Sequence, residues 1–250
     1  MLNIDLIQSI EEKVLLQHCA PIFFLPYPGA MPGSITNNGT VALLNTGRRK
    51  LLVTCHHVWS GFEEYRKEHP SARLGTVFAD GFGQPVFVDE LAMLDWDEGL
   101  DILIFEAAPH RWPMGGKEFF RIHHWPIPKA QKGEIVAFLG FAGEGRNTAG
   151  NIGQFSYTFF GLSITDSSYG RAVLAKDSSP RHLYHDDGTP RTPMRMGGLS
   201  GSPAYVRDRT GAFSLTGFVS MGNTSADDIF LTHAAFINPD GSLNIELSSS

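Results

Sequence analysis

Four residues of types that act together in acyl-transfer chemistry lie at the ends of apolar, strand-like runs. They are a histidine pair, an aspartate and a glycine-flanked serine: His56, His57, Asp101 and Ser200. A serine hydroxyl becomes nucleophilic when a histidine removes its proton, and a buried carboxylate holds that histidine in the required tautomer. The glycines beside Ser200 permit a tight turn, and the backbone N–H groups of Gly198 and Ser200 can then hold an oxyanion. The chain therefore contains the parts of a nucleophile, base and acid site.

Short β-type runs bounded by turns must position these residues. Six runs are expected before residue 107, at 40–44, 51–54, 76–78, 85–88, 91–94 and 102–105. Six more follow residue 132, at 135–139, 154–164, 171–174, 202–206, 214–220 and 229–232. Many short strands with few helices are typical of antiparallel barrels or sandwiches rather than of alternating strands and helices. We predict an all-β fold of two antiparallel six-stranded β-barrels.

Helical spacing and proline content set the expected domain limits. Apolar residues recur at helical spacing over residues 2–16, which predicts an amphipathic helix. Residues 107–132 are rich in Pro and Gly and show no sustained period, which is typical of a connector. The expected units are a helical lead-in (1–19), a first barrel with base and acid (20–106), the connector (107–132), a second barrel with the nucleophile (133–240) and a tail (241–250).

Composition narrows the classes of function and of partner. The 250 residues carry a net charge of −6, which argues against a generic nucleic-acid or anionic-membrane binder. No apolar run approaches the roughly 20 residues needed to cross a bilayer. Two cysteines exclude a multi-disulfide framework, and acidic residues precede the first lysine, Lys13, unlike a secretory signal. We expect a cytoplasmic chain without cofactor or metal.

The motifs resemble those of the trypsin-like serine peptidases of the chymotrypsin fold. Residues 52–58 are similar to the family's Leu/Val-Thr-Ala-x-His-Val, with His57 as base, and residues 101–105 are similar to its acid strand, which Asp101 opens. Residues 198–203 are similar to Gly-x-Ser-Gly-Gly/Ser-Pro, with Ser200 as nucleophile and Ser202 in the Gly/Ser slot, as in several bacterial and viral branches. Residues 217–222 match the later Gly-apolar-Val-Ser-x-Gly strand. The resemblance, over residues 40–237, implies a serine endopeptidase that acts on a protein or peptide through an acyl-enzyme.

The resemblance also implies a primary specificity pocket. Its floor would be Met194, and its wall would be Ser220, Met221 and Gly222. An uncharged floor predicts an apolar side chain before the cleaved bond. Two further charges leave alternatives open: Arg195 would attract an acidic side chain, and the aspartates at 227 and 228 would attract a basic one.

Two departures from the family pattern suggest a second hypothesis. Leu199 stands where digestive members carry the aspartate that pairs with a newly cut N-terminus, and Cys55 has no obvious disulfide partner. The alternative is therefore a latent or partner-gated binding or regulatory module, whose site an activating protein partner completes.

Several residues compete with the assigned ones. His56 could be the base, but the spacing to Val58 favours His57; the rival acids Asp95, Asp97 and Glu98 resemble a solvated turn. Cys55 beside two histidines suggests a thiol nucleophile or a metal ligand, although a small buried side chain is favoured.

Two other motifs do not support a different site. His182 and His185 lie in a polar stretch that favours a loop over a metal site. An α/β-hydrolase nucleophile elbow is excluded, because Ser202 stands where that motif needs Gly.

Overall fold

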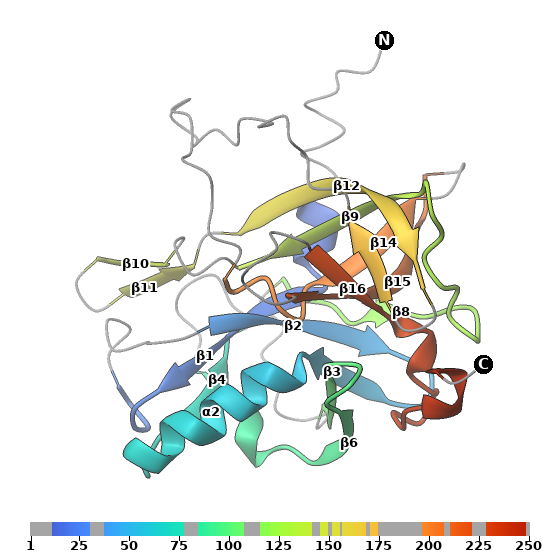
Figure 1. The fold of residues 1–250 in the computed structure, drawn as a ribbon. Helices are drawn as coiled ribbons and strands as arrows, with labels where there is room; N and C mark the ends of the chain where they lie inside the picture. Colours follow the sequence, from blue (N-terminus) through green and yellow to red (C-terminus); the bar gives the residue numbers. More distant parts are fainter. Residues whose placement is uncertain are drawn as a thin grey trace.

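The computed structural model describes residues 12–30, 38–77, 85–107, 116–141, 146–149, 152–155, 157–168, 171–174, 197–207, 211–221 and 229–248 (Figure 1). Two β-structures make up most of this part of the chain. Within these ranges, no helix has the length and apolar character that crossing a membrane requires.

The N-terminal half forms a curled sheet whose strand order departs from the sequence order. Its strands are β1 (Cys19–Leu25), β2 (Asn38–Asn45), β3 (Lys50–Thr54), β4 (Arg73–Thr76), β5 (Val86–Phe87), β6 (Met93–Asp97), β7 (Ile102–Glu106) and β8 (Phe120–Arg121). The order is β5-β4-β1-β2-β3-β7-β6, and β8 pairs in parallel with β2 off this path. Strands β3 and β7 are therefore neighbours, which brings the ends of the expected base and acid segments together.

The C-terminal half closes into a barrel. Its strands are β9 (Ile135–Gly140), β12 (Thr158–Ser167), β13 (Arg171–Leu174), β14 (Pro203–Arg207), β15 (Phe213–Met221) and β16 (Ile229–His233). They close in the order β12-β13-β16-β15-β14-β9, which leaves no exposed sheet edge. A separate hairpin joins β10 (Arg146–Ala149) to β11 (Ile152–Phe155).

The predicted all-β, chymotrypsin-like double-barrel class is confirmed, with one difference in detail. Among the described residues the N-terminal sheet is a half-barrel rather than a closed six-stranded barrel. The domain limits given above stay predictions. The expected strand at 154–164 is divided between β11 and β12.

Three elements of the first half were missed from the sequence: strand β1, helix α2 (His56–Glu68), and strand β8, which lies within the expected connector at 107–132. Strand β1 was not among the expected strand-like runs; its Pro21 lies just outside the segment of β1 that pairs with β4, so the missing N–H is tolerated. Helix α2 begins directly after β3 (Figure 1). It packs Val58 and Phe62 into the core. Of the expected helix at 2–16, residues 12–16 are helical and residues 2–11 lie outside the described residues.

Short 3₁₀ turns complete the described chain: η2 (Val88–Glu90), η4 (Ala234–Phe236) and η5 (Ile245–Ser248).

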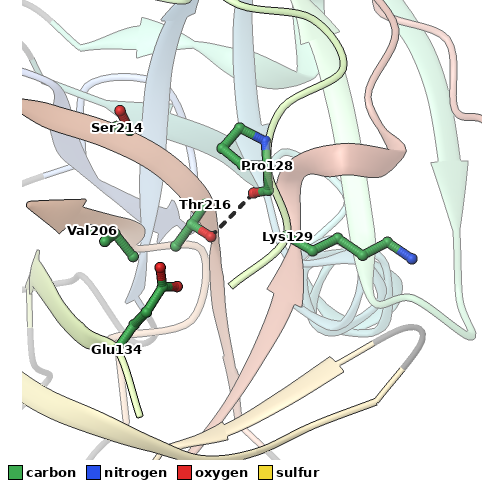
Figure 2. Close-up of a pocket in the computed structure, with 6 residues that line it drawn as sticks. All are labelled: Pro128, Lys129, Glu134, Val206, Ser214 and Thr216. Atoms are coloured by element: carbon green, nitrogen blue, oxygen red, sulfur yellow. Dashed lines mark hydrogen bonds between the residues drawn. The ribbon is translucent and has the colours of Figure 1, made fainter. Parts of the chain in front are cut away.

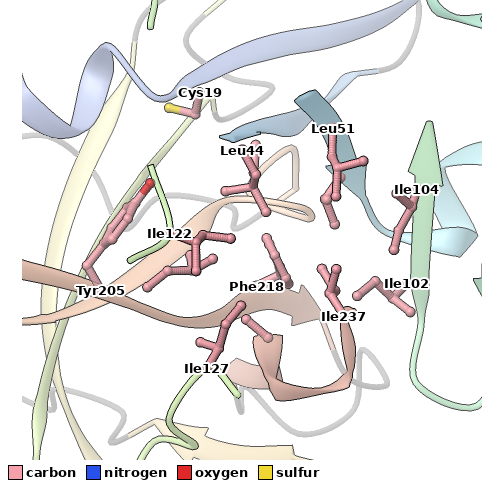
Figure 3. Close-up of a cluster of buried hydrophobic side chains, with 14 of the residues drawn as sticks. Cys19, Leu44, Leu51, Ile102, Ile104, Ile122, Ile127, Tyr205, Phe218 and Ile237 are labelled. Carbon is pink, nitrogen blue, oxygen red and sulfur yellow. The ribbon is translucent and has the colours of Figure 1, made fainter. Parts of the chain in front are cut away.

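One hydrophobic cluster joins the two β-structures. Figure 3 shows Leu51 and Ile104 of the N-terminal sheet beside Phe218 and Ile237 of the C-terminal half. All four are buried. Ile102, the residue after Asp101, belongs to the same cluster, so the packing fixes where the acid-bearing turn meets the barrel.

Candidate active site

His57 lies in the first turn of α2, where backbone N–H groups have no partner within the helix. The N–H of His57 donates to Oδ1 of Asp101 at 2.9 Å. The N-cap residue of the helix, Cys55, makes no side-chain capping bond. Asp101 therefore caps this helix from a distant part of the chain, and its negative charge is favourable at a helix N-terminus.

The imidazole of His57 lies between a carboxylate and a hydroxyl. Its Nδ1 is 2.8 Å from Oδ2 of Asp101, and its Nε2 is 2.9 Å from Oγ of Ser200. Because an ionised carboxylate only accepts, Nδ1 carries the proton in the neutral ring and Nε2 is left to accept from the serine hydroxyl. The side chain of His57 is 47% exposed, whereas that of Asp101 is 14% exposed, so the ring can meet a ligand while the acid is shielded.

Asp101 lies in the turn between β6 and β7, not in the strand itself. Its φ of 55° is the only positive value of a non-glycine residue in the described part of the chain. Aspartate is among the few residues that adopt this conformation readily. The turn is closed by bonds from the Asp101 N–H to the Glu98 carbonyl at 3.2 Å and from the Leu100 N–H to Oδ1 of Asp97 at 2.7 Å.

The competing residues have other partners. The Asp95 carboxylate accepts from the Trp96 and Leu243 N–H groups, and the Asp97 carboxylate closes the acid-bearing turn. The His56 ring stacks on Trp96, with ring centroids 4.7 Å apart. Asp101 is the carboxylate that reaches the ring of His57.

The loop that carries Ser200 depends on glycines. Gly198 and Gly201 have φ values of 99° and 90°. A Cβ on Gly201 would lie 2.1 Å from the Thr40 carbonyl oxygen, so no larger residue fits. Leu199 between them is fully buried in the core of the barrel. The loop is therefore anchored by an apolar side chain.

Thr40 of β2 attaches this loop to the N-terminal sheet. Its hydroxyl donates to the Gly198 carbonyl at 2.9 Å and accepts from the Phe141 N–H at 3.1 Å, while its N–H donates to the Ser200 carbonyl at 2.8 Å. The N–H groups of Gly198 and Ser200 donate to no acceptor among the described residues. Both are thus available to an oxyanion. Sequence reasoning missed Thr40, because a threonine within a strand carries no local signal of such contacts.

The residues expected to form the specificity pocket are only partly described. Ser220 is buried, and its Oγ lies 3.3 Å from Oγ1 of Thr232. The backbone of Met221 ends β15. The remaining expected site residues, Met194 and Gly222, lie outside the described residues, as do Arg195, the aspartates at 227 and 228, His182 and His185.

Cys55 lies next to His57 and Asp101 and is buried. Its Sγ donates to the Val219 carbonyl at 3.3 Å. Burial, followed by the charge of Asp101, raises the pKa of the thiol well above its ordinary value, against a smaller lowering by the Arg171 charge. Donor atoms of Cys55, His57 and Asp101 all lie within 4.8 Å of one another and could in principle hold a metal ion. The raised pKa of Cys55 favours the protonated thiol over the thiolate that a metal needs.

A small pocket lies away from this cluster. Figure 2 shows it beside the barrel, where the Thr216 hydroxyl donates to the Pro128 carbonyl at 3.2 Å. Its volume is about 200 Å³, and it is lined by Pro128, Lys129, Glu134, Val206, Ser214 and Thr216. None of His57, Asp101 and Ser200 lines it, so it is separate from the candidate active site.

A closed barrel joined to a half-barrel, with histidine, aspartate and serine side chains meeting between them, defines the chymotrypsin-like fold. No protein-family model and no curated protein sequence matches the chain. Among solved structures, the scabies mite inactivated protease paralogue S-I1 is similar in fold, with a TM-score of 0.52 and 13% identity over 89% of this chain and 91% of that one.

Two further structures match more loosely. The serine protease domain of the Sesbania mosaic virus polyprotein has a TM-score of 0.46 and 16% identity, over 86% of this chain and 87% of that one. Human heparin binding protein has a TM-score of 0.49 and 12% identity, over 89% and 88%. At these identities the likeness concerns the fold, and it rests on the scabies mite protein.

Proposed function

We propose that this chain is a serine endopeptidase that uses His57, Asp101 and Ser200 as base, acid and nucleophile. The observation that carries the proposal is the imidazole of His57, 2.8 Å from a carboxylate oxygen and 2.9 Å from a serine hydroxyl. The fold alone would not carry it, because the scabies mite protein of similar fold is itself named an inactivated paralogue.

The proposed reaction follows from the proton positions. Ser200 Oγ bonds to the carbonyl carbon of the scissile peptide while its proton passes to Nε2 of His57. The N–H groups of Gly198 and Ser200 hold the oxyanion, and ionised Asp101 stabilises the imidazolium without taking the proton itself. The C–N bond then breaks and Nε2–H protonates the leaving amine. Water attacks the acyl ester by the same route and restores the Ser200 hydroxyl.

The competing proposal is a latent or partner-gated module, in which the oxyanion loop is unformed until an activating protein binds. Two contacts support a loop that is formed without a partner. The Thr40 hydroxyl holds the Gly198 carbonyl, and Leu199 is buried in the barrel core. Since these contacts lie within the chain, we propose that activity is constitutive.

A fluorophosphonate probe tests both proposals on the isolated protein. We expect labelling at Ser200, mapped by mass spectrometry, and its loss in Ser200→Ala. Ser202→Ala is a matched control, because Ser202 is a buried serine two residues away whose Oγ has no hydrogen-bond partner among the described residues; it should still label. Labelling that needs added lysate would favour the gated module, and no labelling under either condition would exclude the peptidase.

Substrate choice and location rest on the sequence. We propose cleavage after an apolar side chain, since Met194 would floor the pocket, and a protein or peptide substrate in the cytoplasm. A peptide library cleaved mainly after Lys, Arg or Glu would contradict the apolar preference.

A further inference from the structure

The turn that carries the acid, residues 99–101, receives two hydrogen bonds from the C-terminal barrel. The Arg171 guanidinium donates from Nη2 to the Gly99 carbonyl at 2.7 Å, and the Thr232 hydroxyl donates to the Leu100 carbonyl at 2.7 Å. Arg171 begins β13 and Thr232 lies in β16, and the two are directly paired in the sheet. One paired position of the barrel therefore holds two consecutive carbonyls just before Asp101.

These contacts act on a turn whose conformation is uncommon. The φ of Asp101 is 55°, and a return to negative φ would swing its carboxylate away from His57. The orientation of the two preceding peptide groups decides whether the chain can make that return. Because both carbonyls are held by donors on a closed barrel, the positive φ is supported from outside the turn.

The Thr232 hydroxyl is well placed to hold the Leu100 carbonyl firmly. Thr232 is buried, and its single proton is committed to Leu100, since a carbonyl can only accept. Its oxygen, 3.3 Å from Oγ of Ser220, is then free to accept a second bond. Hydrogen bonds in a chain of hydroxyls that ends on a carbonyl strengthen one another, and the burial of Thr232 and Ser220 shields these groups from bulk water.

We propose that Arg171 and Thr232 are positioning residues of the active site, forming a clamp that holds Asp101 in line with Nδ1 of His57. The clamp connects the two halves of the fold, which carry different residues of the proposed site. The base lies in α2, which follows β3 of the N-terminal sheet, and the acid lies in the turn between β6 and β7 of that sheet, whereas Ser200 lies in the loop before β14 of the barrel. Tying the acid turn to β13 and β16 sets the carboxylate relative to the barrel that carries the nucleophile. This inference rests on the proposed function, and it concerns residues that act through Asp101 rather than on substrate.

The first test compares variants by the second-order rate constant for fluorophosphonate labelling of Ser200. Thr232→Val keeps the shape but removes the donor, and we expect labelling about 10–100-fold slower, as for a catalytic group displaced by a fraction of an ångström to one ångström. Thr232→Ser keeps the hydroxyl and should label within about threefold of the parent. Arg171→Met should slow labelling less, about 3–10-fold, because this side chain is partly exposed and its bond competes with water.

A double-mutant cycle separates positioning from general loss of structure. If the clamp acts through the carboxylate, then Thr232→Val should cost almost nothing in an Asp101→Asn background, since the acid is already lost. An equal slowing in both backgrounds would overturn the proposal. So would a Thr232→Val variant that labels at the parental rate.

A spectroscopic readout keeps the inference testable apart from activity. In Ser200→Ala, the Nδ1–H of His57 bonded to Asp101 should give a far-downfield proton resonance. We expect this resonance to persist with Thr232→Ser and to broaden or disappear with Thr232→Val, at a Tm that shows both variants folded. An unchanged resonance in Thr232→Val would overturn the clamp, even if labelling had shown that the chain is a peptidase. Conversely, a lost resonance in a chain that never labels would support the clamp and refute the peptidase.

Discussion

Thr40→Val tests whether a single side chain outside the three catalytic candidates forms the oxyanion loop. Valine matches threonine in shape but cannot donate to the Gly198 carbonyl or accept from the Phe141 N–H. The bond from the residue 40 N–H to the Ser200 carbonyl, at 2.8 Å, is unaffected. The substitution therefore removes one of the two hydrogen bonds between residue 40 and the loop and keeps the other.

The expected magnitude follows from burial. Thr40 is fully buried, so two polar groups lose their partner where water does not replace it. At about 1–3 kcal/mol for each unsatisfied group, the free energy of unfolding should fall by roughly 2–6 kcal/mol. For a chain of this size this corresponds to a Tm lower by roughly 5–20 °C, with the protein still folded at room temperature.

The substitution should also lower kcat in the protein that remains folded. With its carbonyl released, Gly198 is held less firmly, and because it has no Cβ its backbone can rotate and turn the Gly198 N–H away from the oxyanion position. Loss of one oxyanion donor typically costs about 10²–10³ in kcat. We expect kcat for a cleaved peptide to fall by that factor with KM little changed, since the donor acts mainly on the transition state.

The assay needs folded protein at a temperature below both melting transitions, with kcat, KM and the labelling rate measured in parallel. Thr40→Ser is the matched control, because it retains the hydroxyl and should keep kcat within a few-fold. A Thr40→Val variant with parental kcat would refute the role of Thr40 in forming the loop. A variant in which KM rises and kcat does not fall would place its effect on substrate binding instead.

Two further predictions concern the acid and a buried histidine. In Asp101→Asn the amide can still accept from the His57 N–H through its oxygen, which turns its NH₂ toward Nδ1 and forces the ring proton onto Nε2. Turnover should fall about 10⁴-fold in a protein that stays folded, with Tm lower by no more than about 4 °C from the lost charge at the helix N-terminus, and near-parental turnover would refute the acid assignment. His233 is fully buried beside the Ser168 carbonyl, and burial lowers its pKa from 6.5. The unfolded chain therefore binds more protons than the folded one below pH 6.5, so this residue's contribution to stability is present above that pH and is lost as the pH falls through the lower folded pKa. Tm should drop between pH 7 and 5, and less steeply in His233→Gln, which keeps a donor but does not titrate; the slope should not vanish, because burial also lowers the pKa of His18. An identical slope in the variant would show that His233 does not titrate over this range.

The first half of the fold shows where sequence patterns were insufficient. The apolar run at 51–54 predicted β3, and the chain then enters α2 at His56, which the strand-like pattern around the histidines concealed. Strand β1 carries a proline, a residue that usually disfavours strands, and its missing N–H is tolerated because the pairing with β4 stops at Ile22. Both misses have one cause: neighbours from other parts of the chain override the local preference.

The sequence by itself determined the chemistry available to this protein, because residue types and their local motifs identify His57, Asp101 and Ser200 without reference to distance. Only the tertiary structure decided that they meet, since 44 and 143 residues separate His57 from its two partners. It also decided what holds them: the left-handed turn at Asp101, the Thr40 attachment, and the donors Arg171 and Thr232. Hydrogen bonds between residues far apart in the chain depend on strand pairing and barrel closure. The local sequence around a threonine or arginine in a strand is the same whether or not its side chain makes such a bond.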